Sequence, residues 1–375
     1  RSTLINISSG KLFLDDNKVS EIFINKGIDN FGIIATGAAS ELTLKPNIKI
    51  GTAADNVNGT IALYGTNGAK IHLHSGNNIE TNGESSHGVI LTGAGSVLDD
   101  VSSGFSHNFT ATGKKSALLY AESGATIDLS NSSQINLKAS GDESIGVYAK
   151  NGTIKLGTAG TGTGNYEIGK NGVLFYSDGT GAGRIETSGV NFTVGDGSLF
   201  TRITTGNEQI KFTHTTGHTN LNLLSGGIGF VYTGDGITPV TPVLINSYFS
   251  NNYSGLGNMN VTVNSGARLY IIEKYASINL SAIGTITAPS AIFNNVVNNV
   301  PIGTGVTGSM LEESTSWFGG SDKTDYPSVD KIKKKVKTYF AKANMLNNNS
   351  ASGAGAGTEG DQSLLDKLMA VDRKS

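Results

Sequence analysis

The sequence of 375 residues is 37% hydrophobic and 15% charged, so the chain is long and apolar enough to bury a sizeable core. It contains no cysteine, which excludes disulfides, thiolate nucleophiles and cysteine metal sites. The formal net charge of −2 and the lack of any run of about 20 apolar residues indicate no nucleic-acid partner and no direct membrane insertion.

Glycine is unusually frequent, with 51 glycines against 6 prolines. An excess of glycine, asparagine, serine and threonine indicates many turns between many short strands. The first ten residues, "RSTLINISSG", lack the charged and then apolar pattern of a signal peptide. We therefore expect an all-β chain that is an internal or processed fragment.

One strand pattern recurs along the chain. Similar segments start about 28 residues apart, which is the spacing of a solenoid repeat. They read "GIIATG" (32–37), "TIALYG" (60–65), "GVILTG" (88–93), "ALLYAE" (117–122), "GVYAKN" (146–151), "GVLFYS" (172–177) and "GFVYTG" (229–234).

Two further strand series follow within each repeat. The second includes "ELTL" (41–44), "KIHLH" (70–74) and "TIKL" (153–156), and the third includes "NIKI" (47–50), "QINL" (134–137), "NFTV" (191–194) and "NVTV" (260–263). Three strands per repeat fit neither a propeller blade nor a hexapeptide helix. The pattern predicts a right-handed parallel β-helix of roughly ten coils between Leu4 and Thr287, with strands stacked about 4.8 Å apart.

Alternation within the strands predicts two inward ladders. The first contains Ile33, Ile61, Val89, Leu118, Val147, Val173 and Phe230. The second contains Leu42, Ile71, Ile127, Ile154, Ile185 and Ile210. Since no single coil can bury its own apolar side, stability must come from stacking.

An insertion interrupts the repeat at residues 238–257. Insertions in solenoids commonly form loops on the binding side. Tyr248, Phe249 and Tyr253 lie here among serines and asparagines, and we expect them to contact a sugar or protein ligand. The alternative is that "VLINSYF" (243–249) is an ordinary inward strand followed by a long turn.

The β-helix is expected to occupy residues 1–305, and the pattern changes beyond it. Residues 306–346 form a predicted cap region that contains an amphipathic helix at 328–346, residues 347–360 have linker composition, and 361–375 show a short C-terminal helical pattern. The helix carries lysines at 331, 333, 334, 335 and 337. These indicate either a solvated helix face or contact with an acidic partner or membrane surface.

Stacked units of the form "GVYAKNGTIKL" followed by a polar strand resemble the passenger domains of type V secreted autotransporters, especially the large fusobacterial adhesins. The resemblance covers residues 20–290. It implies export through the outer membrane, a β-helix displayed on the bacterial cell surface, and adhesion to host cells or other bacteria. No terminal barrel sequence is present here, so anchoring and release by cleavage both remain open.

Candidates for chemistry are sparse. Asp99, Asp100, Asp128 and Glu186, with Arg184, have the residue types of a glycan lyase or hydrolase, and solvated outward positions explain the same residues. His72 and His74 lie on one strand face without a third metal ligand, and His214 and His218 lie near a turn. We expect no catalytic residue, no metal and no cofactor.

These patterns predict a non-enzymatic, surface-displayed or secreted passenger that acts as an adhesin or rigid adhesive stalk and as a virulence factor. Its partners would be a host-cell surface protein or glycan, or another bacterium. Two alternatives remain, a β-helix carbohydrate-active enzyme and a secreted toxin whose basic helix at 328–346 acts on membranes.

Overall fold

The computed structural model describes residues 3–55, 57–178, 183–203, 209–215, 219–273 and 295–297. The chain divides into two compact units, Arg1–Tyr326 and Pro327–Ser375, and every described residue belongs to the first. The predicted regions at 306–346, 347–360 and 361–375 lie outside the described residues, as do residues 274–294 and 298–305 of the predicted β-helix.

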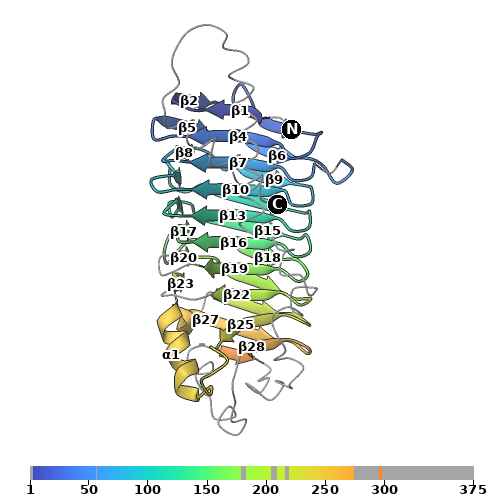
Figure 1. The fold of residues 1–375 in the computed structure, drawn as a ribbon, viewed down its shortest axis with the longest axis vertical. Helices are drawn as coiled ribbons and strands as arrows, with labels where there is room; N and C mark the ends of the chain where they lie inside the picture. The colour runs from blue at the N-terminus through green and yellow to red at the C-terminus, as the bar shows by residue number, and fades with distance from the viewer. Residues whose placement is uncertain are drawn as a thin grey trace, which may run out of the picture. The chain divides into compact units, whose positions relative to one another are not determined.

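Three parallel sheets make up the described unit (Figure 1). The first sheet contains β1 Thr3–Ile7, β4 Phe31–Thr36, β7 Ile61–Thr66, β10 His87–Thr92, β13 Ala117–Glu122, β16 Ile145–Lys150, β19 Val173–Asp178, β22 Leu199–Ile203, β25 Ile228–Thr233 and β28 Arg268–Glu273. The second contains β2 Gly10–Leu14, β5 Ser40–Leu44, β8 Lys70–Leu73, β11 Val97–Asp100, β14 Thr126–Leu129, β17 Thr153–Leu156, β20 Arg184–Thr187, β23 Gln209–Phe212 and β26 Tyr253–Ser254.

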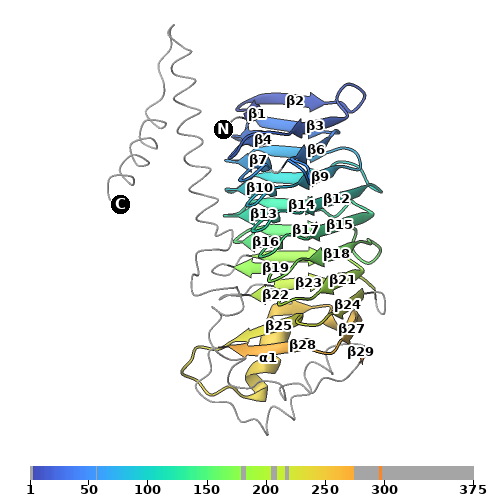
Figure 2. The same ribbon diagram turned by 90° about the vertical axis from the view of Figure 1, so that its right-hand side faces the viewer.

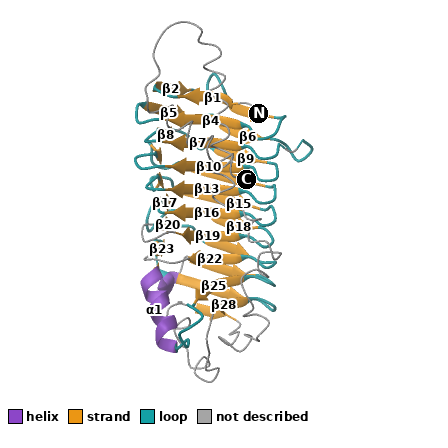
Figure 3. Ribbon diagram, in the orientation of Figure 1, coloured by secondary structure: helices purple, strands orange, loops and turns teal. Residues whose placement is uncertain are grey.

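The third sheet contains β3 Glu21–Ile24, β6 Asn47–Ile50, β9 Asn78–Thr81, β12 Ser106–Ala111, β15 Gln134–Ala139, β18 Asn165–Ile168, β21 Asn191–Val194, β24 Thr219–Leu223, β27 Met259–Val263 and β29 Asn295–Val297. One α-helix, α1 Pro242–Asn252, and one 3-10 helix, Leu256–Asn258, interrupt the strands among the described residues (Figure 3).

The chain visits the three sheets in turn, and each strand pairs in parallel with its counterpart in the next coil (Figure 2). The predicted right-handed parallel β-helix with three strands per coil is confirmed. The predicted ladder of the second sheet is also confirmed, with Leu98 between Ile71 and Ile127.

The predicted ladder of the first sheet is wrong at three positions. Leu63, Leu119 and Phe175 stand in register with their neighbours where Ile61, Leu118 and Val173 were expected. The physical reason is a local break in alternation, because the adjacent residues Leu118 and Leu119 both pack into the main core. A strict period of two therefore loses the register at this point of the coil.

The first sheet differs from the other two because both of its faces are buried. A second ladder on the face away from the core contains Ile34, Tyr64, Ile90, Tyr120 and Tyr148, which are in register and each 4% exposed or less. In the second and third sheets, by contrast, buried and exposed residues alternate. The accessible strand faces therefore belong to the second and third sheets.

Closely stacked glycines form the corner between the third and first sheets. A Cβ atom on Gly141 would lie 1.9 Å from the carbonyl oxygen of Gly113, and one on Gly113 would lie 1.8 Å from that of Gly83. The neighbouring atoms are backbone, so they cannot move aside as a side chain would. Only glycine permits successive coils to approach this closely here.

Replacing Gly141 by alanine is expected to destabilise the protein by about 1–3 kcal/mol or more, because the new methyl group overlaps a fixed backbone carbonyl. Urea unfolding followed by circular dichroism measures the effect. The adjacent exposed residue provides the control, and Ser140→Ala should change stability by less than about 0.5 kcal/mol. Equal stability of the two variants would contradict the stacking argument.

Candidate ligand-binding surface

A column of asparagines runs along the outer face of the third sheet. In a stacked coil, residues at one register position lie above one another, and alternation keeps them all on one face. Glu21 occupies this position in the first coil. Asparagine occupies it in the nine strands that follow, at Asn47, Asn78, Asn108, Asn136, Asn165, Asn191, Asn220, Asn260 and Asn295.

Side-chain amides join these residues into a hydrogen-bonded ladder. Asn108 Nδ2 donates to Asn78 Oδ1 at 2.6 Å, and Asn136 Nδ2 donates to Asn108 Oδ1 at 2.8 Å. Further bonds link Asn191 to Asn165 at 2.8 Å and Asn220 to Asn191 at 3.1 Å. An amide has two donor hydrogens and two acceptor lone pairs, so Asn108 keeps one of each for solvent or a ligand.

A second outward column accompanies the asparagines and carries compensated charge. Lys49 Nζ lies 3.5 Å from Glu80 Oε1, and Lys138 Nζ lies 3.4 Å from Glu167 Oε2. Each pair bridges two neighbouring coils. These contacts are exposed, so they add little stability and mainly set the local charge of the face.

A groove lies between the two columns in the first four coils. Its lining includes Glu21, Asn47, Lys49, Asn78, Glu80 and Asn108. Phe23, on the outer face of β3, stands in register with Lys49 and is 42% exposed. Amides, charged groups and an exposed aromatic ring thus occur together at one place on the third sheet.

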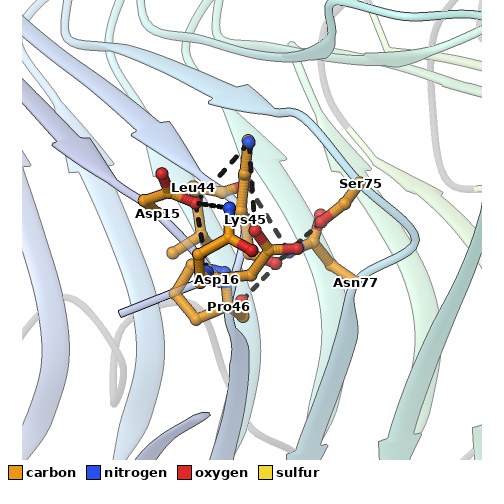
Figure 4. Close-up of polar contacts among 8 residues, drawn as sticks. Asp15, Asp16, Leu44, Lys45, Pro46, Ser75 and Asn77 are labelled. Atoms are coloured by element: carbon orange, nitrogen blue, oxygen red, sulfur yellow. Dashed lines mark hydrogen bonds and ion pairs between the residues drawn. The ribbon is translucent and has the colours of Figure 1, made fainter. Parts of the chain in front are cut away.

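A polar corner fixes the first residues of the ladder (Figure 4). The buried side chain of Asn77 donates to the carbonyl oxygens of Lys45 at 2.9 Å and Pro46 at 3.0 Å, and Ser75 Oγ donates to Lys45 O at 2.8 Å. Lys45 Nζ also lies 3.6 Å from Asp15 Oδ1. The corner therefore positions the chain immediately before the ladder positions in β6 and β9.

His107 closes this corner from the next coil. Its imidazole is fully buried, and its Nδ1 accepts the backbone N–H of Asn77 at 3.1 Å. Burial lowers the pKa of His107 to about 4, because the charged form would lose its hydration. Neutral imidazole is also the form that can accept this hydrogen bond.

Comparison with known proteins returns no match to a family model, a curated protein or a solved structure.

The carboxylates considered for catalysis lie in and beside a charge row on the outer face of the second sheet. His72 Nδ1 lies 2.5 Å from Asp99 Oδ1, Lys155 Nζ lies 3.1 Å from Asp128 Oδ2, and Lys211 Nζ lies 3.6 Å from Glu186 Oε2. Burial acts to raise the pKa of Asp128, but hydrogen bonds from Ser130 and Lys155 outweigh it and lower the pKa. The structure thus joins these carboxylates to histidine or lysine side chains in neighbouring coils.

Asp100, another of the carboxylates considered for catalysis, is enclosed by the protein. It is buried, with Ser132 Oγ donating to its carboxylate and Asn131 N donating at 3.3 Å. Burial raises the pKa of Asp100, and the hydrogen bonds only partly offset this. The neighbouring candidate Arg184 lies in the adjacent outward column of the second sheet, in register with Thr153.

The histidines do not converge on a metal site within the described residues. His74 packs edge to face against Phe13 with ring centroids 6.3 Å apart, and His214 is buried in another coil. His218 lies outside the described residues. No group of three or more histidine, aspartate or glutamate side chains suited to a metal ion occurs in the described part of the chain.

The insertion at 238–257 forms α1 instead of the expected loop, and the alternative of an inward strand at 243–249 is also wrong. Thr241 caps the helix by accepting the backbone N–H of Leu244 at 3.3 Å, and Pro242 occupies its first turn. Both residues favour the start of a helix, which explains the outcome.

The three aromatic residues predicted to contact ligand lie mostly inside the protein. Phe249 is 1% exposed, and Tyr253 is buried within β26. Tyr248 is half-buried, and its hydroxyl donates to Val231 O at 2.7 Å. Their rings contact one another and Phe230, so this placement gives no support to a ligand-binding role for them.

Proposed function

We propose that the chain is a passenger segment of a type V autotransporter, displayed on the bacterial surface or secreted, that acts as an adhesin or adhesive stalk. The observation that carries the proposal is the asparagine ladder on an accessible sheet face. Many equivalent, modest contacts along such a face add up to firm attachment through multivalency. The partner is a host-cell surface protein or glycan, or another bacterium.

The stacking of the coils supports the stalk function. Ten strands of the first sheet, about 4.8 Å apart, place the outermost coils roughly 43 Å from each other. Because each strand pairs with both neighbours, the coils hold the outer face at fixed spacing. Among the described residues, no helix is both long and apolar enough to cross a bilayer.

Adhesion of beads coated with the protein to epithelial or bacterial cells tests the proposal. The variant Asn108→Leu/Asn136→Leu removes two adjacent rungs of the ladder and is expected to reduce bead attachment at least tenfold, since each lost hydrogen bond contributes about 1 kcal/mol. The matched control is Thr126→Leu/Thr153→Leu, two adjacent outward positions of the second sheet.

Attachment that is lost equally in both variants, or in neither, would count against the third sheet as the adhesive face. Absence of attachment by the unaltered protein to every cell type would count against adhesion itself.

A second candidate function is a carbohydrate-active enzyme. It is favoured by the register of Asp99 with Asp128 in adjacent coils, between His72 and Lys155. Two positioned carboxylates are the minimum machinery for glycoside cleavage. Product analysis on any bound glycan separates the two functions, because an adhesin leaves the glycan intact. The toxin alternative depends on residues 328–346, which lie outside the described residues.

A further inference from the structure

We infer that the groove on the first four coils of the third sheet binds an uncharged linear glycan, which lies along the asparagine ladder. The inference deepens the proposed function, on which it rests, by naming the ligand class of the adhesive face. The residues that carry it are Phe23, Asn47, Asn78 and Asn108.

The charge of the groove disfavours anionic ligands. Its lining contains one cation, Lys49, and two carboxylates, Glu21 and Glu80. Lys49 already lies 3.5 Å from Glu80, so its charge is compensated. A sialylated or sulfated glycan, or a nucleic acid, would bring further negative charge to a groove whose net charge is already negative.

The amides match the chemistry of sugar hydroxyls. A hydroxyl both donates and accepts a hydrogen bond, and Asn108 offers one donor and one acceptor beyond its ladder contacts. Within the groove, the oxygens of Asn47 and Asn78 also accept one hydrogen bond each and keep a second lone pair, at a spacing of about 4.8 Å per coil. An extended pyranose chain advances by a similar distance per sugar, so successive sugars meet successive amides.

Phe23 supplies the apolar part of the site. Phe23 is exposed and stands in register with Lys49, so it lies on the same face of the sheet at the N-terminal side of the groove lining. Aromatic surface packs against the C–H face of a pyranose ring, and the combination of one aromatic ring with several oriented polar groups is typical of small-ligand sites. The ladder sets the direction in which the glycan lies, and Phe23 marks one end of the glycan site.

A peptide strand is a poorer occupant of this face. Strand addition requires the unpaired backbone of a sheet edge. Three strands under the groove, β6, β9 and β12, are paired on both sides and present side chains only. β3 ends the described sheet, and a peptide paired with it would extend the sheet instead of lying along the ladder. A partner protein binding by its own side chains is left as an outcome of the test.

Binding of the full chain to immobilised cellohexaose, chitohexaose and mannohexaose, with hyaluronan and heparin as anionic probes, tests the inference. We expect saturable binding to at least one neutral hexasaccharide and none to the anionic probes. Asn78→Leu/Asn108→Leu, within the groove, should lower the affinity at least tenfold. The matched pair Thr126→Leu/Thr153→Leu, two adjacent outward positions of the second sheet and so outside the ladder, should leave it within twofold.

No binding to any neutral hexasaccharide, or an equal loss in both pairs, would overturn the inference. If circular dichroism shows that the groove pair does not fold, the single variant Phe23→Ala replaces it. Its affinity for the glycan is expected to be at least threefold lower. Unchanged binding by this variant would overturn the inference. Cell attachment that persists without neutral-glycan binding identifies a protein ligand. That result would reject the glycan while leaving the adhesive function in place.

Discussion

Replacing Phe192 by alanine is expected to lower the free energy of unfolding by about 3–5 kcal/mol, the range for deleting a buried aromatic ring. Phe192 is fully buried in the centre of the coil. Its ring centroid lies 5.1 Å from that of Phe200, 5.3 Å from Tyr166, 5.6 Å from Phe175 and 5.9 Å from Phe212. The deletion leaves a cavity among rings held in three different sheets, and the pairing of the coils limits how far these rings can move inward to fill it.

Urea unfolding followed by circular dichroism measures this loss. The midpoint and the slope of the unfolding transition are compared between the variants. The matched control is Phe13→Ala, because Phe13 is 54% exposed and contacts only the surface groups Lys45 and His74 among the rings and cations described. Its replacement should cost less than about 1 kcal/mol. Similar losses in the two variants would mean that the aromatic cluster is not the centre of stability.

The second sheet could be predicted residue by residue, and the first could not. Strands such as "TIDL" and "TIKL" alternate strictly, so Ile127 and Ile154 were assigned to the core correctly. In "ALLYAE" every residue is apolar or small except the last, so alternation does not show which side chains face the core. The register then depends on the local break at Leu118 and Leu119, which only the stacked structure reveals.

The candidate surface was present in the sequence but was not identified as a surface. The strands "NIKI", "NFTV" and "NVTV" all begin with asparagine, which is a visible signal. Interpreting it requires the register that stacks Asn191 on Asn165 and Asn220. The insertion, in contrast, predicts a ligand contact at Tyr248, Phe249 and Tyr253, which the structure does not support. Their apolar rings were needed in the core at the point where α1 leaves the coil.

His107 is expected to make the stability of the protein depend on pH between about 6.5 and 4. In the folded protein its pKa is lowered to about 4 from the ordinary value of 6.5, so in this range the unfolded chain binds more protons. Stability is therefore fully present above pH 6.5 and falls as the pH drops through this window. A shift of this size corresponds to a loss of about 3 kcal/mol at pH 4 and below.

Stability of the unaltered protein and of His107→Gln, measured by urea unfolding at pH 8, 6, 5 and 4, isolates this effect. Glutamine retains an acceptor for the Asn77 N–H but does not titrate, so the difference between the two proteins should shrink by about 3 kcal/mol from pH 8 to pH 4. Thr126→Gln, at an outward position of the second sheet that does not titrate, is the control and should follow the unaltered protein. A constant difference across the range would mean that His107 becomes protonated without disturbing the corner that positions Asn47 and Asn78.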